Sequence, residues 1–305
     1  GAVEVIELTG LASEGSGLFG YENGKYPHGN SLTVTGSRQT AIIDPSLGVV
    51  ARKAVLPSVD MVIHSHVHED HIAGLHLFPE ASCFAHAEDA QGLASLSGLM
   101  EIFGYEGEPA AAWKASVVKD YFYQSRPDVQ SFSNGDKFDL GGVSIEIIHT
   151  PGHTRGHSCL LIDWENNDER LCVLGDIDLT SFGPYYGDGW SSLVDFEQSL
   201  ELLKSVEAHW WLTFHHKGLI EGRREFLTML EKYSKMIDSR ESRLLAYLSE
   251  PRSLDQIVEH QFIYRPGTGG VMVDQIERRS MRMHLERLLQ SQEVLVDAAH
   301  RWQAR

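Results

Sequence analysis

Cysteines, long apolar runs and basic residues are all scarce in this chain. It has three cysteines, widely spaced and without a Cys-x-x-Cys pair, which argues against a disulfide framework and indicates a reducing compartment. No apolar run approaches the ~20 residues that cross a bilayer, and no basic segment precedes an apolar one at the start. The sequence therefore predicts a cytoplasmic protein without a membrane partner.

Positive charge is also in short supply. The chain carries 26 Lys and Arg against 43 Asp and Glu, a net charge of −17. Residues 236–305 hold ten arginines and ten acids and are neutral, so the whole excess lies in residues 1–235. A field of this sign repels a polyanion. Nucleic acid is therefore disfavoured as a partner, and a small-molecule substrate is favoured.

Histidine, by contrast, is concentrated in one short run. Residues 64–71 read His-Ser-His-Val-His-Glu-Asp-His, with four imidazoles and two carboxylates in eight residues. Imidazole is the commonest metal ligand and carboxylate is a usual oxygen ligand of zinc. Without a cation, groups packed this densely would be desolvated or would repel one another when protonated. The run therefore predicts a metal site. In an extended segment His66 and His68 point the same way and can share one ion, while Asp70 and His71 lie on the turn beyond and can reach a second.

Three later segments carry further candidate ligands. They are a Pro-Gly-His turn at 151–153, a strand that ends in Gly-Asp at 175–176, and a His-His pair at 215–216. In this order the four motifs resemble the metallo-β-lactamase superfamily. The resemblance implies a first ion held by His66, His68 and His153, a second ion held by Asp70, His71 and His216, and Asp176 as the bridge between them. The residues that follow the His-His pair favour His216, and His215 is the alternative ligand.

The same resemblance implies a four-layer αβ/βα sandwich of the α/β class and a hydrolytic activity. Two divalent metal ions, zinc first and iron or manganese as alternatives, would share a bridging hydroxide that attacks an ester, thioester or lactone carbonyl. Asp70 or His157 would help to move the proton. Tyr185 follows the bridging motif closely, and it either donates to the developing oxyanion or simply packs. Asp44 ends an earlier strand and either orients a ligand imidazole or forms a plain turn.

The chain changes character after the last motif. Residues 1–220 are predicted to form the metallo-β-lactamase domain, and residues 221–305 a small helical, winged-helix-like module. This module is similar to the C-terminal part of one superfamily branch, and the chain as a whole is closest in pattern to that branch, which includes lactamase-like protein 2 and glyoxalase II-like proteins. Its long helix carries four arginines, which form either a basic face or a solvated face paired with Glu277 and Glu286: Arg278, Arg279, Arg282 and Arg287. A metal-dependent endoribonuclease or phosphodiesterase is therefore the alternative enzyme. The module can equally be a homodimer surface, or the partner surface of a ligand-sensing protein with low turnover.

Apolar periodicity and turn residues predict the elements between these motifs. Strands are expected at 3–8, 31–35, 40–44, 61–63, 143–148, 160–164, 171–174 and 293–296. Helices are expected at 87–100, 193–206, 223–237, 239–248 and 271–289, with a further short helix capped by Ser253. The segment 101–128 is rich in aromatic residues, and it either packs as ordinary helix or forms a wall over the metals.

Overall fold

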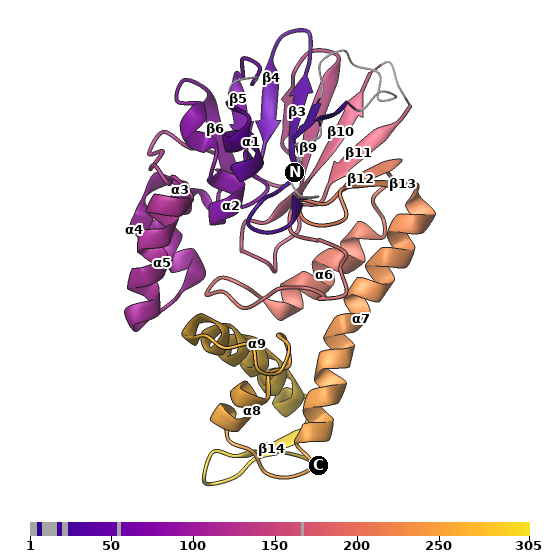
Figure 1. Cartoon of the computed structure of the whole chain (residues 1–305). Helices are drawn as coiled ribbons and strands as arrows, with labels where there is room; N and C mark the ends of the chain where they lie inside the picture. Colours follow the sequence, from indigo (N-terminus) through magenta and orange to yellow (C-terminus); the bar gives the residue numbers. More distant parts are fainter. Residues whose placement is uncertain (1–4, 8–16, 20–23, 54–55, 166–167) are drawn as a thin grey trace.

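Two mixed β-sheets stack face to face at the centre of the computed structural model, which describes residues 5–7, 17–19, 24–53, 56–165 and 168–305 (Figure 1). The strands of the first sheet, in spatial order from β1 to β7, are Val5–Glu7, Gly17–Phe19, Ser31–Thr35, Thr40–Ile43, Met61–Ile63, Ser82–His86 and Gln130–Phe132. The strands of the second sheet, in spatial order from β13 to β8, are Leu219–Glu221, Trp210–Leu212, Arg170–Val173, Ser158–Trp164, Val143–His149 and Lys137–Asp139. The first strand expected from the sequence is described only at β1, and its flanking residues lie outside the described part.

Strand pairing in the first sheet changes from antiparallel to parallel at β4. The expected hairpin joins β3 to β4, with Leu32 opposite Ile43 and Thr35 opposite Thr40. From β4 to β7 the neighbours run parallel. Parallel strands that are covered on both faces consist of short runs of apolar residues. All three residues of β5 are buried, in agreement with this pattern. The carboxyl end of β5 therefore delivers the histidine run to one edge of the sandwich.

The two sheets bury a common apolar core between them. Val34, Ile43 and Ile63 of the first sheet pack in one cluster with Ile145 and Ile162 of the second. Burying a side chain of this size fully contributes about 1.5–3 kcal/mol relative to leaving it exposed. A one-residue slip would turn these side chains out of the core, so burial fixes the strand register.

Helices cover the outer face of each sheet and complete the four layers (Figure 1). On the first sheet they are α1 Leu47–Ala51, α2 Glu69–Ile72, the 3-10 turn η3 Leu75–Leu77, α3 Ala90–Ala94, α4 Leu96–Phe103 and α5 Gly107–Asp120. On the second sheet they are α6 Leu193–Leu203 and α7 Arg223–Tyr247. No helix in the described part of the chain is both long and apolar enough to cross a membrane.

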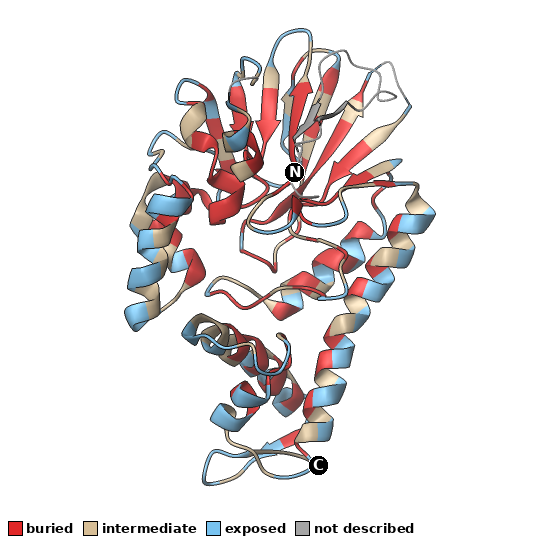
Figure 2. Ribbon diagram, viewed as in Figure 1, coloured by how far each residue is buried: buried red, intermediate tan, exposed pale blue. Residues whose placement is uncertain are grey.

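Two helix predictions are wrong in detail. The helix expected over 87–100 is divided, because Ser95 is extended and its Oγ caps α4 by accepting the Gly98 N–H at 3.0 Å. The two helices expected between residues 223 and 248 are one helix of 25 residues, α7. Its buried residues recur every three or four positions without interruption, so a single buried stripe, apolar except at Arg240, faces the core along its length (Figure 2).

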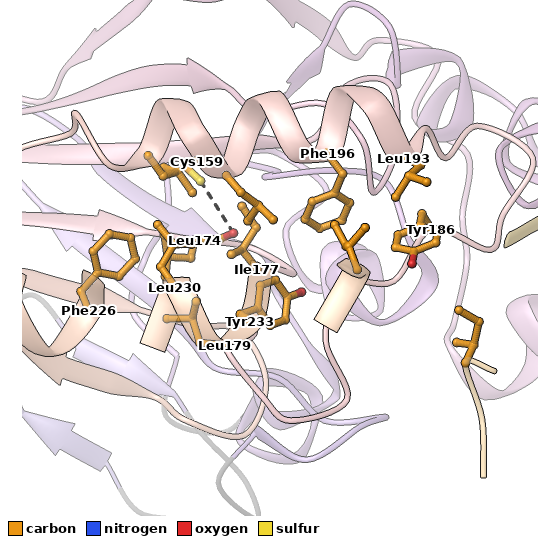
Figure 3. Close-up of a cluster of buried hydrophobic side chains, with 14 of the residues drawn as sticks. Cys159, Leu174, Ile177, Leu179, Tyr186, Leu193, Phe196, Phe226, Leu230 and Tyr233 are labelled. Atoms are coloured by element: carbon orange, nitrogen blue, oxygen red, sulfur yellow. Dashed lines mark hydrogen bonds between the residues drawn. The ribbon is translucent and has the colours of Figure 1, made fainter. Parts of the chain in front are cut away.

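The chain ends in two more helices and a hairpin, which are α8 Leu254–His260, α9 Val271–Gln290, β14 Val294–Val296 and β15 Trp302–Ala304. Ser253 caps α8 as expected, through a capping box with Gln256. One apolar cluster runs from the second sheet through α6 and α7 to Leu285 of α9. Figure 3 shows part of it, where Leu230 of α7 lies against Leu174. The domain boundary at 220 stays a prediction, and the residues after it pack directly on the sandwich.

Candidate metal centre

The histidine run connects β5 to α2 and is anchored by an acid at the end of β4. The backbone N–H of Ser65 donates to Asp44 Oδ1 at 2.7 Å, and the Ser65 hydroxyl donates to Asp44 Oδ2 at 2.6 Å. Asp44 Oδ2 also lies 3.1 Å from Nδ1 of His71. Of the two roles expected for Asp44, the structure therefore favours the orientation of a ligand imidazole.

A first group of side chains converges from three parts of the chain. His66 and His68 come from the histidine run, His153 from the Pro-Gly-His turn, and Asp176 from the Gly-Asp motif after β11. Nε2 of His153 lies 3.0 Å from Nδ1 of His68 and 3.2 Å from Oδ2 of Asp176. One ligand atom from each of the four lies within 4.8 Å of the others. These are the residues that the sequence assigned to the first ion and the bridge.

A second group lies on the other side of Asp176. It consists of Asp70, His71 and His215. Oδ1 of Asp176 is 2.8 Å from Nε2 of His71 and 3.7 Å from Nε2 of His215. Nε2 of His215 is also 3.0 Å from Oδ2 of Asp70. The two carboxylate oxygens of Asp176 thus face different groups, which is the arrangement expected of a bridging ligand.

The preference for His216 over His215 is corrected by this geometry. Nδ1 of His215 donates to the carbonyl oxygens of Gly24 at 2.8 Å and His28 at 3.0 Å, which turns Nε2 toward Asp70. His216 has a positive φ of 62°, and its exposed side chain lies at the cavity wall, outside both groups. The alignment of the following residues misled the prediction, because the backbone reverses between the two histidines.

Burial sets the protonation of two histidines in the first group. Desolvation, reinforced by neighbouring imidazoles, holds the pKa of His66 and of His68 well below the ordinary value. Both rings are therefore neutral at neutral pH and keep a lone pair for a metal. Nε2 of His66 is buried without a hydrogen-bond partner. An unsatisfied buried polar atom costs about 1–3 kcal/mol, and a bound cation would remove that cost.

The imidazoles of the second group lie among carboxylates, which favour the protonated form of the rings. Burial alone would lower the pKa of His71, but Asp176 and Asp44 raise it to about 10. Burial opposes protonation of His215 as well, and Asp176 and Asp178 raise its pKa well above the ordinary value. Protons on these imidazoles neutralise the carboxylates, and a divalent cation can replace them. Imidazole and carboxylate donors suit zinc, iron and manganese, so the residues fit the metals expected from the sequence.

His157 lies behind the bridging residue rather than in the cavity. Its Nδ1 donates to the carbonyl oxygen of Thr150 at 3.0 Å, and its Nε2 accepts the backbone N–H of Asp176 at 3.2 Å. Burial, with the nearby charge of His153, lowers its pKa to about 3. It is absent from the described residues that line the cavity. The predicted role in proton transfer is therefore corrected to a role in positioning Asp176.

A carboxylate that the sequence analysis did not single out lies beside the first group. Oδ1 of Asp188 accepts the hydroxyls of Tyr105 at 2.9 Å and Tyr185 at 3.1 Å, and its Oδ2 lies 3.5 Å from Nε2 of His68. Because Nδ1 of His68 faces His153, its Nε2 is free to donate to this carboxylate. Burial raises the pKa of Asp188 to about 6. The only signal in the sequence was an acid in the aromatic run that carries Tyr185.

Both groups open into a cavity of about 460 Å³. The candidate ligands that line it are His68, Asp70, His153, Asp176 and His215. Tyr185 also lines it, but its hydroxyl donates to Asp188, so the predicted donation to an oxyanion would require that hydrogen bond to break. The aromatic segment 101–128 contributes Tyr105 and Trp113, which is the wall role that was one of its two expected roles.

Comparison with known proteins identifies the family to which this fold belongs. Residues 26–232 match the family model for the metallo-beta-lactamase superfamily. The chain belongs to this superfamily. Human acyl-coenzyme A thioesterase MBLAC2 is 25% identical over 199 residues, which are 57% of this chain and 68% of the relative. A metallo-beta-lactamase family protein from Thermus thermophilus superposes with a TM-score of 0.69 at 20% identity, covering 95% of this chain and 99% of that one. A beta-lactamase domain protein from Burkholderia ambifaria superposes with a TM-score of 0.67 at 16% identity, covering 99% of this chain and 94% of that one.

Membership of the metallo-β-lactamase superfamily confirms the predicted fold class. The observed strand order, with helices outside both sheets, is the four-layer sandwich inferred from the motifs. The protein is accordingly a hydrolase of the metallo-β-lactamase fold.

Proposed function

We propose that the protein is a dinuclear metal-dependent hydrolase that cleaves small-molecule acyl thioesters or esters. The position of Asp176 carries this proposal, because its two oxygens face separate ligand groups at the cavity wall. A carboxylate shared by two cations offsets the repulsion between them. The sequence similarity to a thioesterase supports a thioester as the first substrate class to test.

Two sets of side chains would hold the ions. We assign the first ion to His66, His68 and His153, the second to Asp70, His71 and His215, and Asp176 to both. Zinc is our first choice, and iron or manganese are alternatives that the same donors accept. When bound, the ions would supply Lewis acidity toward a carbonyl oxygen and make water a competent nucleophile at neutral pH.

The reaction adds water across the acyl C–S or C–O bond. The carbonyl carbon gains the hydroxyl, and the departing thiol or alcohol takes the proton. Asp70 lines the cavity, so it is placed to accept a proton from the attacking water and return it to the leaving group. Tyr185 keeps its phenol proton because burial raises its pKa, and it holds Asp188 beside His68.

The alternative nuclease function depends on a free basic face on α9, and the side-chain partners there argue against one. Arg278 donates to Asp255 at 2.6 Å, and Arg287 donates to Glu197 at 2.7 Å. Arg279 donates to backbone carbonyl oxygens of α4 and the loop after β11. Arginines engaged in this way have little left to offer a phosphate backbone. We therefore place carbonyl hydrolysis first.

The test combines a metal count with a substrate panel. Protein loaded with zinc, iron or manganese is analysed by elemental mass spectrometry and assayed on p-nitrophenyl esters, thioesters, lactones and phosphodiesters. We expect one ion for each ligand group and hydrolysis of thioesters and esters. Asp176→Asn should lose both metal and activity, whereas Asp195→Asn, in the first turn of α6 and outside both ligand groups, should lose neither. Full activity in Asp176→Asn, or cleavage of phosphodiesters alone, would overturn the proposal.

A further inference from the structure

The cavity extends beyond the candidate ligands into an apolar half that the hydrolytic chemistry does not use. One wall of this half comes from Phe103 of α4 and Trp113 of α5, whose rings meet edge to face with centroids 5.5 Å apart. Phe103 also stacks on His68 with centroids 5.1 Å apart, so the apolar half begins directly beside the first ligand group. A further wall comes from the first two turns of α9, which contribute Met272, Val273 and Ile276.

Polar contacts hold α9 in place over the cavity. The Gln275 side chain accepts the backbone N–H of Glu106 and donates to its carbonyl oxygen, both at 3.2 Å. Arg279 donates to the carbonyl oxygens of Phe103 at 3.2 Å and Gly187 at 3.3 Å. These bonds tie α9 both to the α4–α5 segment and to the loop that carries Asp188. Figure 1 shows α9 beneath the sandwich, with α5 on one side and α7 on the other. The first turns of α9 therefore form a fixed wall of the cavity.

The chemistry of this half favours an uncharged apolar group. No Lys or Arg is among the described residues that line the cavity. The guanidinium groups of Arg240 and Arg279 lie against residues of the cavity wall, and both donate to backbone carbonyl oxygens. A phosphate or carboxylate placed here would lose its hydration without gaining a cationic partner. A hydrocarbon chain would instead bury its surface against the aromatic rings and the aliphatic side chains of α9.

We infer that this apolar half is an acyl-binding subsite and that Val273 and Met272 of α9 set the length of acyl chain it accepts. The inference rests on the proposed function, because it places the acyl carbonyl at Asp176 and the acyl chain between α4–α5 and α9. A volume of about 460 Å³ is within the range of small-molecule pockets, so the subsite holds a chain of limited length.

An acyl-binding subsite of this size predicts that kcat/KM rises with the length of the acyl chain and then reaches a plateau. Each further methylene group buried against these walls should raise kcat/KM about fourfold. The rise should stop once the chain fills the cavity. Val273→Trp would fill part of the space and stop the rise at a shorter chain, whereas Met272→Ala would extend it to a longer one. Val271 lies on the same turn but is 62% exposed and does not line the cavity, so Val271→Trp is the matched control.

The experiment measures hydrolysis and binding separately. Metal-loaded wild type and the three variants are assayed on N-acetylcysteamine thioesters from acetyl to decanoyl. Binding of the matching non-hydrolysable thioethers is measured by calorimetry. We expect the Val273→Trp and Met272→Ala profiles to shift in opposite directions in both measurements, while Val271→Trp follows wild type.

The outcomes separate this inference from the proposed function. Thioester hydrolysis with the same length profile in wild type and Val273→Trp would overturn the subsite and leave the hydrolase intact. Length-dependent binding that Val273→Trp truncates, without hydrolysis of any thioester or ester, would support the subsite and overturn the hydrolase. Binding that ignores chain length in the wild type would overturn the subsite directly. The opposite-direction variant Met272→Ala guards against a Val273→Trp protein that fails to fold.

Discussion

Replacing Asp188 by Asn tests whether the carboxylate beside the first ligand group holds His68 in place. The substitution keeps Oδ1 as the acceptor for the hydroxyls of Tyr105 and Tyr185. It puts an amide NH2 where Oδ2 now lies 3.5 Å from Nε2 of His68. Two donors would then face each other across this contact. We expect the first ion to bind more weakly, because the imidazole would lose the partner that orients it and makes it more basic.

The expected magnitude follows from the length of the contact. A hydrogen bond to a charged group contributes about 1.5–3 kcal/mol, and carboxylate partners of metal-bound histidines are worth roughly 10–100-fold in metal affinity. At 3.5 Å the contact between Asp188 and His68 is long. We therefore expect the lower end of that range, about tenfold weaker binding of the first ion.

Competition with a chromophoric chelator measures the affinity for each ion, and the spectrum of the cobalt-loaded protein reports the geometry of the first group. Asp274→Asn is the matched control, since Asp274 is an exposed acid in the first turn of α9 and its replacement removes the same charge. Unchanged affinity for the first ion in Asp188→Asn would refute the positioning role. An equal loss in Asp274→Asn would show that net charge is responsible instead.

Three further predictions test other parts of the site and its support. His215→Ala should lose the second ion and most of the hydrolysis, while His216→Ala should keep the full metal content; elemental analysis decides, and the reverse result would restore the alignment-based assignment. Gly152 has φ +134°, and a Cβ there would lie 2.3 Å from Cα of Phe196. Gly152→Ala should therefore lower Tm and the occupancy of the first ion together, and normal values for both would contradict the steric argument. Glu241 links α7 to α9: burial raises its pKa, but hydrogen bonds from α9 lower it below the ordinary value overall. A lowered folded-state pKa stabilises the protein above the unfolded value and loses this effect as pH falls through the folded value. Glu241→Gln should thus lower the free energy of unfolding by about 1–2 kcal/mol near neutral pH. The difference in stability between the variant and the wild type should disappear below about pH 4.3. Urea unfolding of both proteins between neutral pH and about pH 4 measures this difference in stability, and a difference that does not change with pH would count against the ion pair.

The candidate ligands were predictable from the sequence where their geometry is local. His66 and His68 alternate along an extended segment, so their common direction follows from the period of that segment. The assignment of His215 depends instead on contacts with Gly24 and His28, about 190 residues earlier in the chain. The residue type of His216 gives no indication that its backbone adopts a positive φ. Motif alignment could not choose between the two adjacent histidines, because the choice depends on these long-range contacts.

The supporting residues were harder to predict, because their partners are distant in sequence. Asp188 acquires its role only when Tyr105, 83 positions earlier, folds against it. His157 was expected at the reacting atoms, yet it folds behind Asp176 and holds that residue by its backbone N–H. The motif indicated correctly that His157 lies close to the candidate ligands. Which side of the bridging residue it occupies depends on the packing of β10 against β9, through Thr150.

Arg240 shows why the C-terminal helices belong to the site and are more than an appended module. It lies in the polar middle of α7, yet only 1% of its surface is exposed. Its guanidinium donates to the carbonyl oxygens of Phe182 at 2.6 Å and Pro184 at 2.5 Å, and to the hydroxyl of Tyr186 at 2.9 Å. Those residues belong to the loop that carries Asp188 to the first ligand group. A buried guanidinium without these acceptors would be strongly destabilising, so the loop and α7 stabilise each other. Residues 1–220 alone would retain the ligand motifs but lose both the apolar wall from α9 and the support that α7 gives to the loop beside His68.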